Sequence, residues 1–210
     1  QKVGAGARGG NVLAQASQRL GGGGHQGRSR RHRAAITGLH AQEIAAARAG
    51  ADLLIVALHK GIVHTPAKLA EYERPLAEAA LDAGADIVVG HHAHILRGVE
   101  LYKDLPLFHG LGNGCVVTHA LSPSQDHPAR AAWAQKRKQM FGFEPDPRYE
   151  LAPFHPEAVH AVIGVVRRDA GGRLSMGVIP VHVEPPGRPV CVNDARAEEV
   201  IAYLDRIGAM

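Results

Sequence analysis

The sequence predicts an α/β fold with a parallel sheet, because two short apolar runs are joined by a connection of helix length. The first run is residues 53–58, Leu-Leu-Ile-Val-Ala-Leu, and the second is residues 86–89, Asp-Ile-Val-Val. Short apolar runs bounded by turn residues are typical of strands that are buried on both faces. A strand–helix–strand unit normally crosses over right-handed and makes its strands parallel neighbours. We therefore expect these two strands to lie side by side.

Helices are expected before and after the first strand. The alanine-rich residues 41–49 predict a helix that ends at the glycine directly after them. Thr65 is a candidate cap for the second helix, with Pro66 at its first position, and this helix is expected to run to residue 84. Pro75 should kink or divide it, because proline removes a helical hydrogen bond.

The remainder of the chain predicts short strands, a proline-rich stretch and a closing helix. Asp104 is expected in a turn between two strands, and Asp194 is a natural cap for the last helix. Val200, Ile201 and Leu204 should form the apolar stripe of that helix. The expected elements are strands over 98–103 and 106–111, a helix around 129–139, a hairpin over 159–167 and 173–183, and a helix over 194–207.

The first 33 residues are expected to be irregular. They contain four consecutive glycines at 21–24 and a basic, polar stretch at 26–33. Such a segment buries too little apolar surface to offset the entropy of ordering it. A flexible loop is favoured over a phosphate-binding glycine loop, because no strand is predicted before it and no Gly-Lys-Ser/Thr sequence follows.

Composition excludes several classes of protein. A chain of 210 residues with 45% hydrophobic residues can form one domain with a real core. The net charge of +4 is modest, and no basic face interleaved with aromatic residues points to nucleic-acid binding. Cys115 and Cys191 are too few for a disulfide framework or a four-cysteine zinc site. No signal peptide or membrane-spanning run is present, but the chain starts at Gln1, which leaves room for a preceding portion and an anchor.

Histidines follow both apolar runs. His59 comes directly after the first run, and His92 and His94 follow the second. Ligands gather beyond the carboxyl ends of parallel strands, and histidine is the commonest metal ligand. His92 and His94 are spaced so that both can reach one ion, whereas His91, just before them, should point away from these two neighbours. The sequence therefore predicts that His59, His92 and His94 converge.

This set of residues lacks the carboxylates that a binuclear hydrolytic centre needs. His64 and His109 would add only nitrogen ligands, which favour a lone zinc-like ion over a pair of hard ions. The alternative interpretation is that the histidines are ordinary loop residues with local hydrogen bonds.

Several segments in order resemble one known family. Residues 51–61 resemble a family strand that ends in His-Trp-Gly, and residues 82–94 resemble its segment with an Asp-Ala-Gly-Ala-Asp start and a Gly-x-His-Pro-His end. Residues 99–103 and 107–113 resemble a segment that closes on Leu-Gly-Asn. The family is that of the bacterial capsule-synthesis proteins CapA/PgsA, associated with poly-γ-glutamate capsules, in the calcineurin-like metallophosphoesterase superfamily. The dense resemblance covers residues 51–121.

This resemblance implies a four-layer α/β/β/α sandwich with a site for a divalent metal pair (Mn, Fe or Zn) at the sheet edge. His59 matches an isolated histidine ligand, and His92 and His94 match a Gly-His-x-His ligand pair. His92 would be a ligand or the catalytic donor to the leaving oxygen. The residues expected to bind substrate or orient the loops are Asn113, His91 and His109.

The departures from the family pattern are equally informative. The superfamily's early ligands, two aspartates and an Asn-His pair, have no counterpart between Gln1 and His40. Lys60 stands where the family usually has tryptophan, and Gly114 where it usually has phenylalanine. We therefore expect residues 1–40 to be an irregular remnant of the N-terminal part, residues 41–210 to be the C-terminal portion of a single domain, and the metal pair to be incomplete.

Three functions are consistent with these observations. The first is metal-dependent phosphoester hydrolysis in capsule biosynthesis. The second is a non-catalytic role in the assembly or export of capsule polymer, and the third is an inactive fragment. The resemblance implies a bacterial protein that works with capsule-synthesis or export components and is associated with the cell envelope through a preceding segment.

Overall fold

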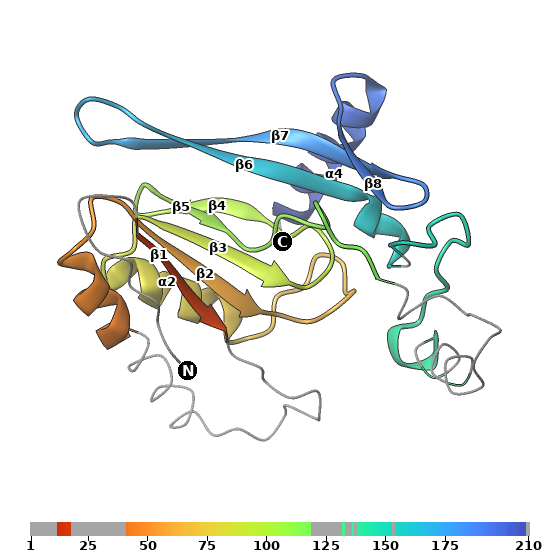
Figure 1. Ribbon diagram of the computed structural model, residues 1–210, viewed down its shortest axis with the longest axis horizontal. Coiled ribbons are helices and arrows are strands. Elements are labelled where there is room, and N and C mark those ends of the chain that lie inside the picture. Colours follow the sequence, from red (N-terminus) through yellow and green to blue (C-terminus); the bar gives the residue numbers. More distant parts are fainter. Residues whose placement is uncertain are drawn as a thin grey trace.

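The chain builds two β-sheets that lie over one another (Figure 1). The larger sheet has the strand order β1-β2-β3-β5-β4, and the smaller has the order β6-β7-β8. In the larger sheet only β4 runs antiparallel to its neighbour. The predicted α/β class is confirmed. This computed structural model describes residues 12–17 (backbone only), 41–118, 132, 136, 138–152 and 154–208.

The described elements alternate strands and helices in the first half of the chain, and a sheet and a helix make up the second half. The larger sheet consists of β1 (Val12–Ser17), β2 (Leu54–Lys60), β3 (Ile87–His92), β4 (Val99–Tyr102) and β5 (Leu105–Phe108). The smaller sheet consists of β6 (His160–Arg168), β7 (Leu174–Glu184) and β8 (Arg188–Cys191). The helices are residues 41–48, α2 (Glu73–Asp82), the 3₁₀ turn η2 (Pro156–Val159) and α4 (Ala195–Gly208).

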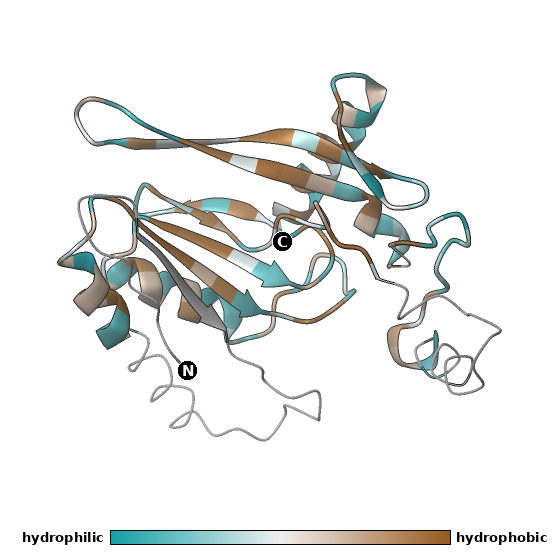
Figure 2. Ribbon diagram, viewed as in Figure 1, coloured by the Kyte–Doolittle hydropathy of each residue, from teal (hydrophilic) through white to brown (hydrophobic). Residues whose placement is uncertain are grey.

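Strands β2 and β3 are adjacent and parallel, which confirms the central prediction. Alternate residues of β2, namely Leu54, Val56 and Leu58, are fully buried and pack against α2 and the helix at 41–48. Because side chains alternate along a strand, the residues between them point to the other face, toward the smaller sheet. Hydrophobic residues accordingly line the central strands in Figure 2.

Residues 12–17 form a strand, so the expectation that residues 1–33 are irregular is wrong for this segment. Strand β1 pairs in parallel with β2, and Ser17 is the register partner of His59. Its sequence, Val-Leu-Ala-Gln-Ala-Ser, has no long apolar run. This segment forms a strand because it pairs with the edge of β2, a contact in the tertiary structure that local strand propensity does not predict. The glycines at 21–24 and the basic stretch at 26–33 lie outside the described residues.

The helix predicted to begin at Pro66, with Thr65 as its cap, begins seven residues later, at Glu73. His64 and Ala67 have positive φ angles of 55° and 49°, and such left-handed residues interrupt a helix. Pro75 therefore falls in the first turn of α2, where its missing N–H has no helical partner to lose. This position explains why it does not divide the helix.

The predicted hairpins and their turns are confirmed. Strands β4 and β5 pair around Lys103 and Asp104, both with positive φ, as two-residue hairpin turns require. The long hairpin of β6 and β7 turns at residues 169–172. Gly164 of β6 lies against the Phe108 ring, and a Cβ there would come within 2.9 Å of it. This glycine lets the two sheets approach. Most of the helix expected around 129–139 lies outside the described residues.

The closing helix α4 packs beside the smaller sheet. Asp194 caps it by accepting a hydrogen bond from the Arg196 backbone N–H at 3.0 Å, as predicted. The fully buried stripe is Val200, Tyr203 and Ile207, rather than Val200 with Ile201 and Leu204. Those last two residues are only partly buried.

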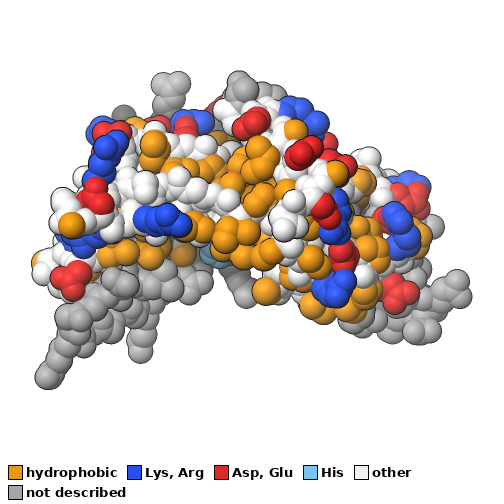
Figure 3. All heavy atoms as spheres, turned by 90° about the horizontal axis from the view of Figure 1, so that it is seen from above, with side chains coloured by type: hydrophobic (Ala, Val, Ile, Leu, Met, Phe, Trp, Pro, Cys, Tyr) orange, Lys and Arg blue, Asp and Glu red, His pale blue; other side chains and the backbone are white. Residues whose placement is uncertain are grey.

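Hydrophobic residues also reach the upper surface, which Figure 3 shows with charged groups around its margin. Ile163 and Ile179 pair across β6 and β7 and are 47% and 42% exposed. Among the described residues, no helix is both long and apolar enough to span a bilayer.

A buried ion pair joins the larger sheet to α2. The Lys60 Nζ at the end of β2 lies 3.2 Å from Glu73 Oε2, with side-chain exposures of 3% and 1%. Glu73 also accepts a hydrogen bond from the Ala70 backbone N–H at 2.7 Å. Burial lowers the pKa of Lys60, and the charge of Glu73 opposes this shift. Neither charge has access to water, so each depends on the other.

We predict that Glu73→Ala destabilises the fold by about 3–5 kcal/mol, because it leaves the Lys60 charge buried without its partner. Replacing both residues, in Lys60→Met/Glu73→Leu, should restore most of this loss, because an apolar pair carries no desolvation penalty. Urea unfolding followed by circular dichroism measures the free energies.

The matched control is Glu144→Ala, which breaks the exposed pair of Glu144 with Lys138. It should change stability little, since exposed pairs contribute little. A Glu73→Ala loss no larger than that of the control would contradict a structural role for the buried pair.

Candidate functional site

Four histidines gather at the carboxyl ends of β2 and β3. The ring centroids of His59 and His92 are 4.3 Å apart, and those of His92 and His94 are 6.3 Å apart. The His91 ring lies 4.7 Å from that of His59. We call His59, His91, His92 and His94 the histidine cluster. The structure thus brings together the three residues that the sequence singled out and adds His91.

His59 and His91 are joined directly through their Nδ1 atoms, which lie 2.8 Å apart. The two residues are register partners on adjacent parallel strands, so their side chains share a face of the sheet. In this hydrogen bond one Nδ1–H donates and the other Nδ1 accepts. In the neutral pair, therefore, only the donating ring has an unprotonated Nε2.

The contact of His91 with His59 was not expected, and backbone geometry explains how His92 reaches the same cluster. Regular alternation sends His91 to the face of His59 and would send His92 to the opposite face. However, His92 has φ 96° and the following His94 has φ 54°. These left-handed conformations, which are uncommon in residues other than glycine, end the alternation and bring both rings to the cluster.

Asn113 fixes the orientation of His94. The Asn113 Nδ2 donates to the His94 backbone oxygen at 2.9 Å, so its Oδ1 is left to accept from the His94 Nδ1–H at 3.1 Å. This pairing selects the His94 tautomer that carries its lone pair on Nε2, the form that binds a metal through Nε2. Asn113 is only 3% exposed. Its expected role in orienting the loop is thus supported by two hydrogen bonds.

Aromatic residues enclose one side of the cluster. The Phe154 ring stacks on His94 with a centroid distance of 4.7 Å and an interplanar angle of 9°. Phe141 and Phe143 pack edge-on against the buried His64, which itself stacks on His94 at 5.8 Å. These phenylalanines were not predicted as part of the site. Their spacing could have indicated a shared role, since three of the chain's four phenylalanines lie within 14 residues.

Burial favours the neutral forms of two cluster members. It lowers the pKa of His91 and of His92, and the neighbouring His59 and His94 lower both further. For His92 the charge of Glu73 acts weakly in the opposite direction. Neutral imidazoles are the form that binds metals.

One other predicted site residue, His109, lies apart from the cluster. His109, just after β5, is 3% exposed and its Nε2 lies 2.6 Å from Glu100 Oε1. Burial lowers the pKa of His109 despite this contact, so the neutral ring donates its Nε2–H to Glu100.

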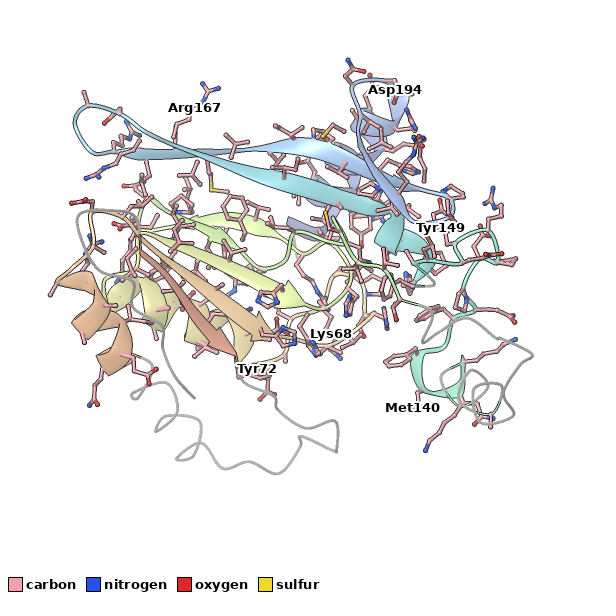
Figure 4. All side chains as sticks on the ribbon, in the orientation of Figure 1. Lys68, Tyr72, Met140, Tyr149, Arg167 and Asp194 are labelled. Carbon is pink, nitrogen blue, oxygen red and sulfur yellow. The ribbon has the colours of Figure 1, made fainter. Side chains whose placement is uncertain are left out.

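Lys60 points to the opposite face of the sheet from His59, toward Glu73. Lys68 and Tyr72 lie close to this edge in Figure 4, and the Tyr72 hydroxyl accepts from the Gly61 backbone N–H.

The described residues fit part of a metal site. They supply imidazole nitrogens at one sheet edge, but within the described ranges no group of three or more His, Cys, Asp or Glu side chains is arranged to hold an ion. The hydrogen bond between His59 and His91 also occupies one nitrogen of each ring. The described residues therefore offer imidazole nitrogens at this edge and do not complete a site for a metal pair.

We predict that His91 and His92 titrate below the ordinary histidine pKa of about 6.5. Because the unfolded chain then takes up protons first, the free energy of unfolding should be constant above about pH 6.5 and fall as the pH drops toward the lower folded values. Nuclear magnetic resonance (NMR) titration gives the pKa values, and urea unfolding at several pH values gives the slope. An unchanged slope in His91→Gln/His92→Gln would contradict this origin.

We further predict that His94 carries its proton on Nδ1 and that Asn113 is the reason. Asn113→Asp keeps the acceptor and should keep this tautomer, whereas Asn113→Leu should lose it and cost about 1–3 kcal/mol from the unpaired buried groups. The ¹⁵N chemical shifts of the His94 ring report the tautomer. The same tautomer in both variants would show that another contact sets it.

Comparison with known proteins identifies relatives along the segment that carries the cluster. The pattern of the bacterial capsule synthesis protein family PGA_cap matches residues 12–116. The chain is 42% identical over 66 residues to the capsule biosynthesis protein CapA of Bacillus anthracis, covering 31% of this chain and 16% of that protein. It is 41% identical over 70 residues to the PGA biosynthesis protein CapA of Bacillus subtilis (strain 168), covering 33% of this chain and 18% of that protein.

A third relative is the uncharacterized protein y4sH of Sinorhizobium fredii, 54% identical over 44 residues, or 21% of this chain and 10% of that protein. The matched segments thus span less than a fifth of each relative's length. The family match, in contrast, spans half of this 210-residue chain and includes β1 to β5, the histidine cluster and Asn113. The chain therefore belongs to the bacterial capsule synthesis protein family PGA_cap.

Proposed function

We propose that this chain supplies the nitrogen-ligand part of a metal-dependent phosphoester-hydrolysing site that serves capsule biosynthesis. The observation that supports the proposal is the gathering of neutral imidazoles at the carboxyl edge of a parallel sheet, where ligands of such sheets bind. A bound divalent metal would polarise the phosphoryl group and balance its charge.

In this proposal, His94 binds the metal through Nε2, because Asn113 holds its Nδ1–H. His59 and His91 together offer one unprotonated Nε2. His92 lies beside His59 and His94 and serves as a ligand or as a proton donor to the leaving oxygen. The Phe154 ring covers one face of His94 and excludes water from it.

We also propose the four-layer arrangement that the resemblance implies. Helices 41–48 and α2 cover one face of the larger sheet, and the smaller sheet covers the other. The helix α4 packs against Val162 and Val178 on the inner face of the smaller sheet and against Leu96. The outer face carries the exposed Ile163 and Ile179, so the fourth layer would come from outside the described residues. Because the relatives are much longer than the matched segments, we propose that the whole protein works with capsule-synthesis or export components and is held at the cell envelope by another part.

A non-catalytic role in capsule assembly is the second candidate, and one observation favours it. The bond between His59 and His91 satisfies these rings within the protein, as expected for a structural cluster. Oxygen ligands for a metal pair would have to come from outside the described residues. The two candidates differ in whether the cluster binds metal.

Metal titration of the purified 210-residue chain tests the proposal. We predict weak binding of Zn²⁺ or Mn²⁺ and little turnover of an aryl phosphate, because neutral imidazoles supply no negative charge to hold two dications. His92→Ala and His94→Ala should each weaken binding by at least roughly tenfold. The matched control is His182→Gln in β7, on the other sheet, which should leave binding unchanged.

Binding that survives both cluster substitutions would contradict the proposal and favour the non-catalytic role. Robust metal-dependent turnover that disappears in His94→Ala would support catalysis and would show that the chain finds oxygen ligands outside the described residues.

A further inference from the structure

A polar cavity lies farther along the same edge of the sheet. It has a volume of about 330 Å³ and is bounded by the loop before α2, the start of β4, the residue after β5 and the end of α4. Its polar lining residues are Lys68, Arg74, Arg97, Glu100 and His109, and its apolar lining includes Leu69, Val99 and Ile207. A cavity of this size lies at the lower end of the range for small-molecule sites, about 300–1,000 Å³.

The charges around this cavity favour an anion. Three cationic side chains, Lys68, Arg74 and Arg97, face a single carboxylate, Glu100. That carboxylate is already paired with Arg74 at 2.6 Å and with His109. Burial alone would raise the pKa of Glu100, but these hydrogen bonds outweigh it and lower the pKa. Glu100 is therefore charged and already paired, so the positive charge of the lining is in excess.

Two buried lining groups have unsatisfied hydrogen-bonding atoms. Arg97 is 1% exposed and uses both terminal nitrogens to hold the backbone oxygens of Lys68 and Ile62, while its Nε–H has no acceptor among the described residues. The His109 Nε2–H donates to Glu100, which leaves its Nδ1 as an acceptor without a donor in the described part of the chain. Unpaired buried polar atoms are uncommon and costly, and a bound ligand is one explanation.

We propose that this cavity binds a small carboxylate with an N–H donor on the adjacent carbon, either a free or an acylated amino acid. The carboxylate accepts from the Arg97 Nε–H and is attracted by Arg74 and Lys68. The ligand N–H donates to His109 Nδ1. The C-terminal end of α4 reaches the cavity at Ile207, and its partial negative charge favours the donor end of the ligand.

This inference goes beyond the proposed function and does not depend on it. The cavity residues are distinct from the histidine cluster, and the binding requires no metal. A matched series of probes separates the interactions, since propionate has only the carboxylate, whereas L-alanine and N-acetyl-L-alanine add an ammonium or an amide N–H. N-acetyl-L-alanine methylamide keeps the amide N–H and lacks the charge.

The experiment is an NMR titration of the full chain with each probe in the presence of EDTA. L-alanine or N-acetyl-L-alanine should bind at least fivefold more tightly than propionate, and the better of the two identifies the source of the N–H. The uncharged methylamide should not bind. Because EDTA removes metals, failure here would leave the proposed metal role untouched.

Substitutions assign the binding to the cavity. Arg74→Gln, at a partly exposed position, should weaken binding at least fivefold, and His109→Phe should abolish the preference over propionate. Arg97→Lys removes the Nε–H, with circular dichroism checking that it folds. The matched control is Arg148→Gln, beside a different cavity, which should not change affinity. Equal binding of propionate and the N–H probes, or binding unaffected by both Arg74→Gln and His109→Phe, would overturn the proposal.

Discussion

The carboxyl edge of the larger sheet depends on a charge pair that water does not reach. Lys60 ends β2 and Glu73 begins α2, and their contact fixes the connection between strand and helix. Glu73 also accepts a hydrogen bond from the Ala70 backbone just before the helix. Arg97 supports the same connection by donating to the backbone oxygens of Ile62 and Lys68. A buried network of this kind specifies one arrangement, because any other leaves a charge unpaired.

The end of β2 serves both faces of the sheet. Adjacent side chains of a strand point to opposite faces, so Lys60 reaches α2 while His59 reaches His91 on the side of the smaller sheet. The ion pair of Lys60 with Glu73 thus holds the end of β2 in place, and the adjacent residue, His59, belongs to the histidine cluster. The same short stretch of backbone therefore positions one side chain for packing against α2 and the next for the cluster.

Periodicity and turn chemistry predicted much of this fold. The parallel pair β2 and β3, the hairpin turn at Asp104 and the cap at Asp194 follow from apolar runs and local backbone preferences, which act over a few residues. Strand β1 could not be predicted in this way, because its sequence has no long apolar run and its pairing is with a segment about 40 residues away. The late start of α2 was not predicted either, because neither the left-handed conformations of His64 and Ala67 nor the contact of Glu73 with Lys60 can be read from the helix pattern.

The candidate site was likewise predicted only in part. The position of the histidines after two strands predicted their gathering, since parallel strands end at one edge. The roles of individual rings required coordinates, because the positive φ of His92 reverses the expected alternation. The contact of Asn113 with His94 joins segments 19 residues apart, and strand spacing carries no information about it.

The phenylalanines that pack beside His94 come from a different part of the chain than the histidine cluster. Phe141, Phe143 and Phe154 all follow residue 116, where the match to the family pattern ends. The segment common to the family thus provides the imidazoles, and a later segment shapes what can approach them. Because Phe154 stacks directly on His94, substitutions in that later segment would change the apolar surface beside the imidazoles while leaving the family segment that supplies them unchanged.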